Sequence, residues 1–150
     1  MPQSLAKLLV HLIYSTKNRE PVLEDQVRDE LHSYSAGILR ELESPAILIN
    51  SVEDHVHILY AHSKNYSPSK IVEEVKKGSS KWLKTKGPAY ATFHWQNGYG
   101  AFSVSQSGVA EVVKYLENQK EHHWRRTFQE EYREFLNRYA VPYDERYVWD

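Results

Sequence analysis

Residues 46–62 read AILINSVEDHVHILYAH and contain two largely apolar runs on either side of a short polar turn. The first run covers residues 46–52, the turn is residues 53–54, and the second run covers residues 55–62. Two such runs joined by a tight turn predict an antiparallel β-hairpin. Side chains alternate between the two faces along a strand. The second strand is therefore expected to fill the core with Val56, Ile58 and Tyr60.

The N-terminal flank predicts a strand and then a helix. Residues 5–16 are almost continuously apolar, which suits a central strand buried on both faces. After Pro21, apolar residues recur at helical spacing until Pro45 ends the pattern. They form one stripe, which consists of Val27, Leu31, Tyr34, Ile38 and Leu42.

The segment after the hairpin predicts a second helix. Ser67 is the expected N-cap and Pro68 the first helical residue. The buried face of this helix is expected to carry Ile71, Val75 and Trp82.

The C-terminal part predicts a strand and two helices. A Gly-rich turn at residues 97–100 precedes a strand at 101–105, and a third helix is expected from about residue 107 through His122. Thr127 and Glu130 form a capping-box pattern that opens a last helix. The first six elements follow the split β-α-β order. The chain is thus expected to be an α+β protein of the ferredoxin-like class, with a four-stranded antiparallel sheet, helices on one face and extra C-terminal helices.

The composition is that of a globular protein. The chain has 150 residues, of which 41% are hydrophobic and 26% charged, so residues 1–150 are expected to form a single domain. It has no cysteine, which fits a reducing compartment. The longest apolar stretch, residues 8–14, is far shorter than the ~20 residues that span a bilayer. The first four residues lack the basic start of a secretory signal. We therefore expect a cytoplasmic protein with no membrane partner.

The net charge of −1 conceals a basic middle segment. Residues 64–106 carry 7 lysines and 2 glutamates, a net charge of +5. Four of the lysines fall on one narrow arc of the second predicted helix, namely Lys70, Lys77, Lys81 and Lys84. Such an arc can follow a phosphate backbone, although an ordinary solvated helix face has the same pattern.

His55 and His57 are the first candidates for chemistry. They point to the same face of the predicted strand, roughly ~6.8 Å apart along the backbone, and can converge on one metal ion. Two half-exposed histidines with no ligand would give the same pattern. Neutral imidazoles leave the choice between Zn²⁺ and Mn²⁺ open.

The third predicted helix carries a second set of candidates. Tyr115, Gln119 and His122 follow one another at i, i+4 and i+7, so a phenol, an amide and an imidazole share one face. This face lies beside the apolar stripe of the same helix. A polar flank with a boundary tyrosine is the simpler interpretation of the pattern by itself.

Three blocks together resemble a known family, and the resemblance covers essentially the whole chain. His55-Val56-His57 is similar to the histidine-hydrophobe-histidine motif of HUH nucleases. Residues 115–123 resemble the nucleophile helix of the single-tyrosine HUH transposases, the small enzymes of bacterial insertion sequences that move as single-stranded DNA. Residues 93–105 resemble the block before that helix, and residues 130–147 resemble the family's tail.

This resemblance implies a specific reaction. It implies a divalent metal, Mg²⁺ or Mn²⁺, on His55, His57 and Gln119, with Tyr115 as the nucleophile and no small-molecule cofactor. Attack by Tyr115 on a DNA phosphate would leave a 5′-phosphotyrosine and a free 3′-hydroxyl. Asp54 and His122 are candidates for groups that support the ligands, and His122 is also a candidate DNA contact or alternative ligand.

The resemblance further implies a bacterial or archaeal protein, a homodimer and single-stranded DNA hairpins as partners, with the lysine arc touching DNA that flanks the site. Three other functions are compatible with the same sequence. One is a non-catalytic nucleic-acid-binding module on the same fold, which predicts aromatic residues on an open sheet face. Another is a different HUH endonuclease, such as a relaxase or a domesticated repeat-processing relative. The third is a metal-dependent hydrolase that uses Glu53 or Asp54 as a base.

Overall fold

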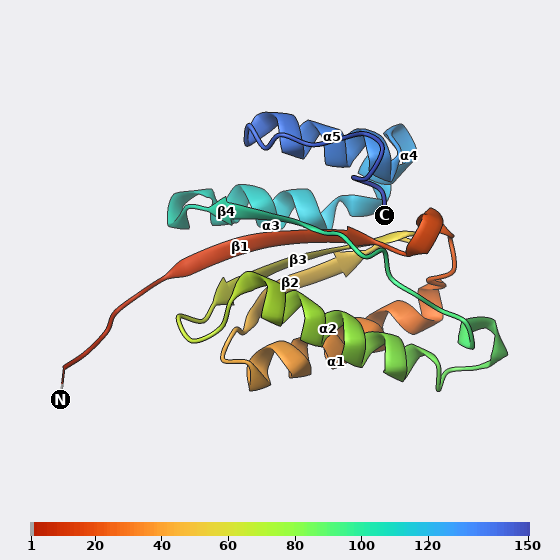
Figure 1. Ribbon diagram of the computed structural model, residues 1–150, viewed down its shortest axis with the longest axis horizontal. Helices are drawn as coiled ribbons and strands as arrows, with labels where there is room; N and C mark the ends of the chain where they lie inside the picture. Colours follow the sequence, from red (N-terminus) through yellow and green to blue (C-terminus); the bar gives the residue numbers. More distant parts are fainter. Residues whose placement is uncertain (1) are drawn as a thin grey trace.

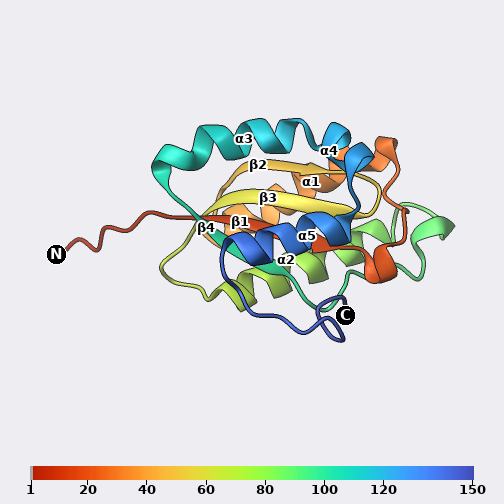
Figure 2. The ribbon, with the colours of Figure 1, turned by 90° about the horizontal axis from the view of Figure 1, so that it is seen from above.

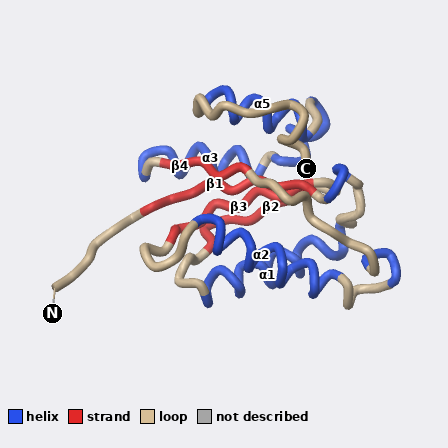
Figure 3. The backbone as a smooth tube through the Cα atoms, in the orientation of Figure 1, coloured by secondary structure: helices blue, strands red, loops and turns tan. Residues whose placement is uncertain are grey.

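The computed structural model describes residues 2–150, which form a four-stranded antiparallel sheet between two sets of helices. Figure 1 shows these layers edge-on, and Figure 3 shows the same layers coloured by secondary structure. The strands are β1 (Leu8–Ser15), β2 (Ala46–Ser51), β3 (His55–His62) and β4 (Gly100–Val104). The helices are α1 (Asp25–Glu41), α2 (Pro68–Leu83), α3 (Val109–Glu117), α4 (Gln119–Arg125) and α5 (Phe128–Arg138).

The strand order β2-β3-β1-β4 is that of the predicted split β-α-β fold, which the structure confirms. The predicted hairpin is β2 and β3, and β1 lies antiparallel to both β3 and β4. In the β1–β3 register, Ile13 is opposite His57 and Ser15 is opposite His55. The histidine pair therefore sits on a central strand, where neighbours on both sides fix its position.

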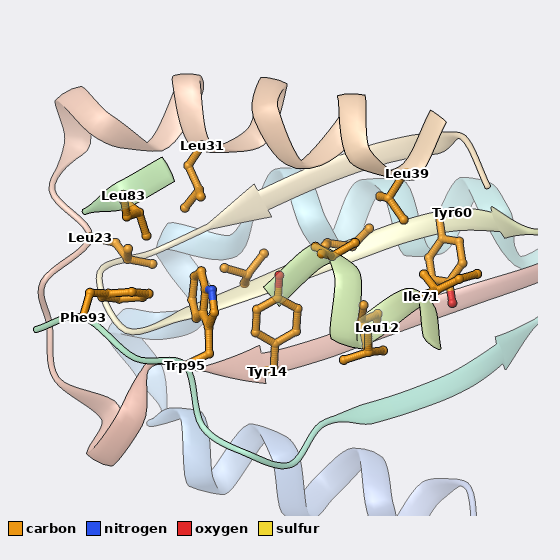
Figure 4. Close-up of a cluster of buried hydrophobic side chains, with 14 of the residues drawn as sticks. Leu12, Tyr14, Leu23, Leu31, Leu39, Tyr60, Ile71, Leu83, Phe93 and Trp95 are labelled. Carbon is orange, nitrogen blue, oxygen red and sulfur yellow. The ribbon is translucent and has the colours of Figure 1, made fainter. Parts of the chain in front are cut away.

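One face of the sheet packs on α1 and α2 through the larger apolar core (Figure 4). Leu12 and Tyr14 of β1 meet Ile58 and Tyr60 of β3 there, all at most 1% exposed. As predicted, Val56, Ile58 and Tyr60 point into this core. The alternation of β3 then leaves His55 and His57 on the other face.

The predicted helix stripes are partly wrong. Tyr34 is 43% exposed and stacks on the half-buried Trp82, so the two rings make a surface contact between α1 and α2. Leu39, five residues after Tyr34, and Leu83, the residue after Trp82, are fully buried instead. The buried face of each helix differs from the predicted stripe because it is the face turned toward the sheet. Tyr34 and Trp82 lie instead where the two helices face each other.

The second face of the sheet, where the histidines lie, is covered by α5 (Figure 2). Ile13 and Phe102 pack there against Phe128, Tyr132 and Phe135 of α5. The predicted capping box is present: Thr127 Oγ1 accepts from the Glu130 amide, and the Glu130 side chain accepts from the Thr127 amide. The open sheet face that a simple nucleic-acid-binding module would present is therefore absent from residues 2–150.

The third predicted helix, from residue 107 to His122, is interrupted. It consists of α3 and α4, and the boundary lies at Asn118, whose φ and ψ are −97° and 22°. The Asn50 amide of β2 donates to the Leu116 carbonyl at 2.6 Å, which fixes the end of α3 beside the sheet. Across residues 2–150, no helix combines the length and the apolar character that a membrane crossing requires.

Candidate active site

His55 and His57 are buried side by side under α5, with 1% and 0% of their surface exposed. Their ring centroids are 5.1 Å apart. The interpretation as two half-exposed histidines is therefore wrong. Burying two imidazoles is costly unless their ring nitrogens find partners, so the groups around them determine what the site can do.

Glu131 of α5 faces both imidazoles with the same carboxylate oxygen. Its Oε1 lies 3.1 Å from His55 Nε2 and 2.9 Å from His57 Nε2, and the residue is 2% exposed. Two ring nitrogens from β3 and one carboxylate from a helix 74 residues further along the chain thus meet at one point.

The outer nitrogens of the two rings are also held. Asp54 Oδ1 accepts from His55 Nδ1 at 2.6 Å, and His11 Nε2 lies 2.8 Å from His57 Nδ1. A partner on Nδ1 fixes the orientation of an imidazole and leaves Nε2 for a second contact, as at metal sites in proteins. Asp54 therefore stands where a supporting group would stand, and His11 of β1 has the same place beside His57.

Tyr115 reaches this cluster from α3. Its hydroxyl donates to Glu131 Oε2, the second oxygen of the same carboxylate. Arg126 Nη2 donates to the same hydroxyl at 2.7 Å. The ring of His122 stacks on the Tyr115 ring at 4.2 Å, so His122 supports the tyrosine, and no contact in residues 2–150 links it to the imidazole pair. The structure thus brings Tyr115 to the histidines within one chain.

Gln119 lies at the same centre and is 1% exposed. Its Nε2 is 3.0 Å from His55 Nε2, while its Oε1 has no hydrogen-bond partner within residues 2–150. An amide can exchange its nitrogen and oxygen by a half-turn. After that exchange the unpaired oxygen would face the same point as the imidazoles and Glu131.

The charges of the centre favour cation binding. Burial opposes charge on His55, but hydrogen bonds to Asp54 and Glu131 raise its pKa to about 9. Burial lowers the pKa of His57 despite the nearby carboxylate. Burial alone would raise the pKa of Glu131, yet the attraction of the two imidazoles holds it well below its usual range. Glu131 is thus an anion.

The pKa of the Tyr115 phenol is raised by burial and by the charge of Glu131, and Arg126 acts in the opposite direction. The phenol is therefore protonated at neutral pH in this arrangement. Its hydroxyl lies between an anion and a cation, which fixes where both the proton and the oxygen lone pairs point.

These donors fit a divalent metal. One ligand atom each from His55, His57 and Glu131 lies within 4.8 Å of the others. Imidazole nitrogens and carboxylate oxygens bind Mn²⁺, Zn²⁺ and related ions, and the unpaired Gln119 oxygen would add an amide ligand. The ligand atoms of a second group, Asp54, His55 and His123, also lie within 4.8 Å of one another. In that group, however, Asp54 already accepts a hydrogen bond from the outer nitrogen of His55.

The lysine arc lies in another layer. Lys70, Lys77, Lys81 and Lys84 are exposed on α2, which covers the sheet face opposite the histidines (Figure 1). Lys70 pairs with Glu74 at 3.0 Å. The structure therefore does not bring these lysines into contact with the centre, and their role on flanking DNA stays a prediction.

A groove reaches the tyrosine from the surface. Its volume is about 550 Å³, and it runs between α3 and α5 with His11 and Tyr115 in its wall. Ser103, Ser105 and Arg138 supply polar groups along it, and Tyr139 supplies an aromatic face. The two serines, which have no role in the sequence pattern, thus line the route to the tyrosine.

Three residues of the centre do not follow from the sequence motifs: Glu131, His11 and Arg126. One signal for Glu131 was present. It falls on the apolar stripe of α5, between Phe128 and Tyr132 and one turn before Phe135. A carboxylate on a buried stripe needs a cationic or metal partner. His11 similarly interrupts the apolar run of β1.

Comparisons with known proteins identify transposases. The family described as "Transposase IS200 like" matches residues 4–119 of the chain. The ISDra2 transposase TnpA of Deinococcus radiodurans is 26% identical over 118 residues, which cover 75% of this chain and 84% of that protein.

Two solved structures share the fold. The crystal structure of a putative transposase from D. radiodurans R1 has a TM-score of 0.62 and 27% identity, and the match covers 79% of this chain and 98% of that one. A REP-associated tyrosine transposase bound to a REP hairpin has a TM-score of 0.60 at 13% identity, over 82% of this chain and 73% of that one, and shows the fold alone.

The fold and the family match place the chain among the single-tyrosine HUH transposases. Within this class, the chain belongs to the IS200-like transposase family.

Proposed function

We propose that this DNA transposase cleaves and rejoins single-stranded DNA with Tyr115 as nucleophile, at a divalent metal held by His55, His57 and Gln119. The observation that carries the proposal is the convergence within one chain. The Tyr115 hydroxyl and both His Nε2 atoms contact the two oxygens of one carboxylate. Family membership alone would not require these groups to meet in this way.

The reaction follows from the chemistry of the phenol. The Tyr115 oxygen would attack the phosphorus of a DNA phosphodiester, and the bond from phosphorus to the 3′-oxygen would break. The phenol would lose its proton and the departing 3′-oxygen would gain one, so the step is balanced without a further reactant. The products are a 5′-phosphotyrosine and a free 3′-hydroxyl. The phosphoester bond is kept in the covalent link, so a 3′-hydroxyl can later reverse the step without ATP.

A phenol with a pKa of ~10 is a weak nucleophile at neutral pH and needs help. A divalent cation on the imidazoles would withdraw charge from the scissile phosphate and orient it. Arg126 holds the Tyr115 oxygen with a positive charge, which favours negative charge developing on that oxygen. Asp54 and His11 keep both Nε2 atoms pointing inward.

The proposed substrate is a single-stranded DNA hairpin. A REP hairpin is bound to one of the proteins that share this fold. The groove beside Tyr115 gives a strand access to the hydroxyl, and the exposed lysine arc of α2 is suited to flanking phosphates. The homodimer that the family resemblance implies stays a prediction, which light scattering of the purified protein would test.

Covalent capture tests the proposal. The protein would be incubated with Mn²⁺ and a labelled single-stranded hairpin from the flanks of its own gene, then denatured. We expect a denaturant-resistant protein–DNA adduct that Tyr115→Phe abolishes, whereas Tyr147→Phe, at a tyrosine that is 65% exposed, leaves it intact. We expect His57→Ala to weaken both metal binding and cleavage.

The same assay separates the alternatives. DNA binding without any adduct would favour the non-catalytic module. Cleavage without an adduct would favour a hydrolase with a water nucleophile. An adduct that persists in Tyr115→Phe would refute the nucleophile assignment.

A further inference from the structure

The carboxylate of Glu131 lies outside the residues that the family model matches. The family match ends at residue 119, whereas Glu131 belongs to α5, in the following segment. We propose that Glu131 is itself a ligand of the divalent metal, so that the C-terminal helix completes the metal centre. This inference rests on the part of the proposed function that places a metal at the imidazole pair.

The ligand atoms of the three side chains converge on one point. Glu131 Oε1 is 3.1 Å from His55 Nε2 and 2.9 Å from His57 Nε2, so its lone pairs point to the place where both inner nitrogens point. The three atoms come from two separate elements, β3 and α5. A carboxylate that was merely neutralising one imidazolium would not need equal contact with both rings.

The burial of the Glu131 side chain also favours a metal beside it. Glu131 is 2% exposed, and its helix face is otherwise apolar. A carboxyl group buried in such surroundings needs a cation or hydrogen-bond partners for its oxygens. A divalent ion at the point where both His Nε2 atoms meet Glu131 Oε1 would engage all three groups at once.

The chemistry of the donors also favours a carboxylate ligand. Two imidazoles and one amide form a neutral set, whereas Mg²⁺ and Mn²⁺ favour carboxylate oxygens. Glu131 would add the negative charge that the neutral set lacks. The Gln119 oxygen can still serve as a further ligand, because its amide lies beside His55 Nε2 and Glu131 Oε2.

The packing of α5 holds this carboxylate in place. Phe128 and Tyr132, on either side of Glu131 along the buried stripe, are 1% and 3% exposed and stack on each other at 5.3 Å. The capping box fixes the start of the helix three residues earlier. A ligand carried on a packed helix is more precisely positioned than one carried on a loop.

The test measures metal binding by the full chain, without DNA. Isothermal titration calorimetry with Mn²⁺ would compare the wild type, Glu131→Gln and the control Glu130→Gln. The control makes the same chemical change one residue earlier, at an exposed side chain, and a capping box accepts Gln. We expect Glu131→Gln to weaken Mn²⁺ binding by about ten-fold or more, a change typical of groups at a metal site, and Glu130→Gln to leave it unchanged.

A second variant and a second readout keep the test independent of folding. Glu131→Asp keeps the charge but withdraws both oxygens by one methylene, and we also expect it to bind Mn²⁺ more weakly than the wild type. Mn²⁺ should raise the melting temperature of the wild type and of Glu130→Gln, but have little effect on Glu131→Gln. A Co²⁺ titration should give a visible spectrum that differs between the wild type and Glu131→Gln.

Unchanged Mn²⁺ affinity in a folded Glu131→Gln or Glu131→Asp variant would overturn the inference, even where Gln119→Ala weakens binding. That result would not affect Tyr115 as the nucleophile. Conversely, a wild type that binds Mn²⁺ through Glu131 but forms no DNA adduct would support the ligand and contradict the cleavage.

Discussion

Tyr115 of α3 donates its hydroxyl hydrogen bond to Glu131 of α5. The other oxygen of that carboxylate faces both imidazoles of β3. One side chain therefore connects the proposed nucleophile to the proposed metal ligands. Any movement of α5 would change the environment of both at the same time.

Arg126 should assist the attack without affecting the metal. It donates to the Tyr115 hydroxyl at 2.7 Å and is 3.9 Å from Glu131 Oε2. A hydrogen bond to a charged group is worth ~1.5–3 kcal/mol, so we expect Arg126→Gln to slow adduct formation by about ten-fold or more. Arg125→Gln, at the neighbouring exposed arginine, is the control. Equal rates in the two variants would exclude this role for Arg126.

Gly100 should be required by the close approach of α5 to β4. A Cβ atom there would lie 2.5 Å from Tyr132 Cε2, on a buried ring. We expect Gly100→Ala to lower the free energy of unfolding by ~1–3 kcal/mol, as overpacking does. Gly37 of α1 has no atom within 4 Å of the corresponding position, so Gly37→Ala should instead stabilise the helix by ~0.5–1 kcal/mol. Urea denaturation measures both, and a stable Gly100→Ala variant would contradict the described packing.

The lysine arc should contact DNA phosphates directly, without any effect on the metal. Lys77 and Lys81 are exposed on α2. Replacing both with Gln removes two phosphate contacts, so the slope of log affinity against log salt should become shallower by about 1.4–1.8, the value for two contacts with DNA. Mn²⁺ affinity should not change. The same substitution at the exposed Lys7 and Lys17 is the control, and an equal effect there would show that only net charge matters.

His32 should make stability depend on pH. Burial lowers its pKa below the ordinary 6.5, while Asp29 raises it and Arg28 lowers it. Its Nε2 contacts Ser51 Oγ at 2.7 Å. The unfolded chain therefore binds a proton on His32 more readily than the folded protein does. The contribution of neutral His32 to the free energy of unfolding is complete above pH 6.5 and is lost as the pH falls toward the lower pKa of the folded state.

Urea denaturation at neutral pH and near ~5 tests this prediction, because the protonation difference lies in that range. The decline in the free energy of unfolding toward acid should be smaller in His32→Gln than in the wild type. Equally steep declines would mean that His32 is protonated equally in both states.

The order of the elements was predictable because local patterns agree with the final packing. The hairpin at residues 46–62 consists of two largely apolar runs around a polar turn, and Ser67-Pro68 and Thr127 mark helix starts with side chains that cap them. The break at Asn118 was not predictable. The residues on both sides have helical spacing, and the contact of Asn50 with the end of α3 is tertiary.

The site was predictable only where its residues form a short motif. His55 and His57 share a strand face, and Tyr115 and Gln119 are one helical turn apart, so their proximity follows from local geometry. Glu131 and His11 come from other elements and reach the centre through the packing of α5 and the register of β1. Their position depends on the complete fold. The sequence signal for both is a polar residue on an apolar stripe.

The most direct test of the central claim is to map the covalent bond. The adduct formed with Mn²⁺ and the hairpin would be digested with nuclease and protease, and the peptides analysed by mass spectrometry. We predict that the peptide with Tyr115 carries a nucleotide joined through its 5′-phosphate to the phenolic oxygen. The chain has 11 tyrosines, and attachment to any tyrosine other than Tyr115 would contradict the mechanism proposed for this centre.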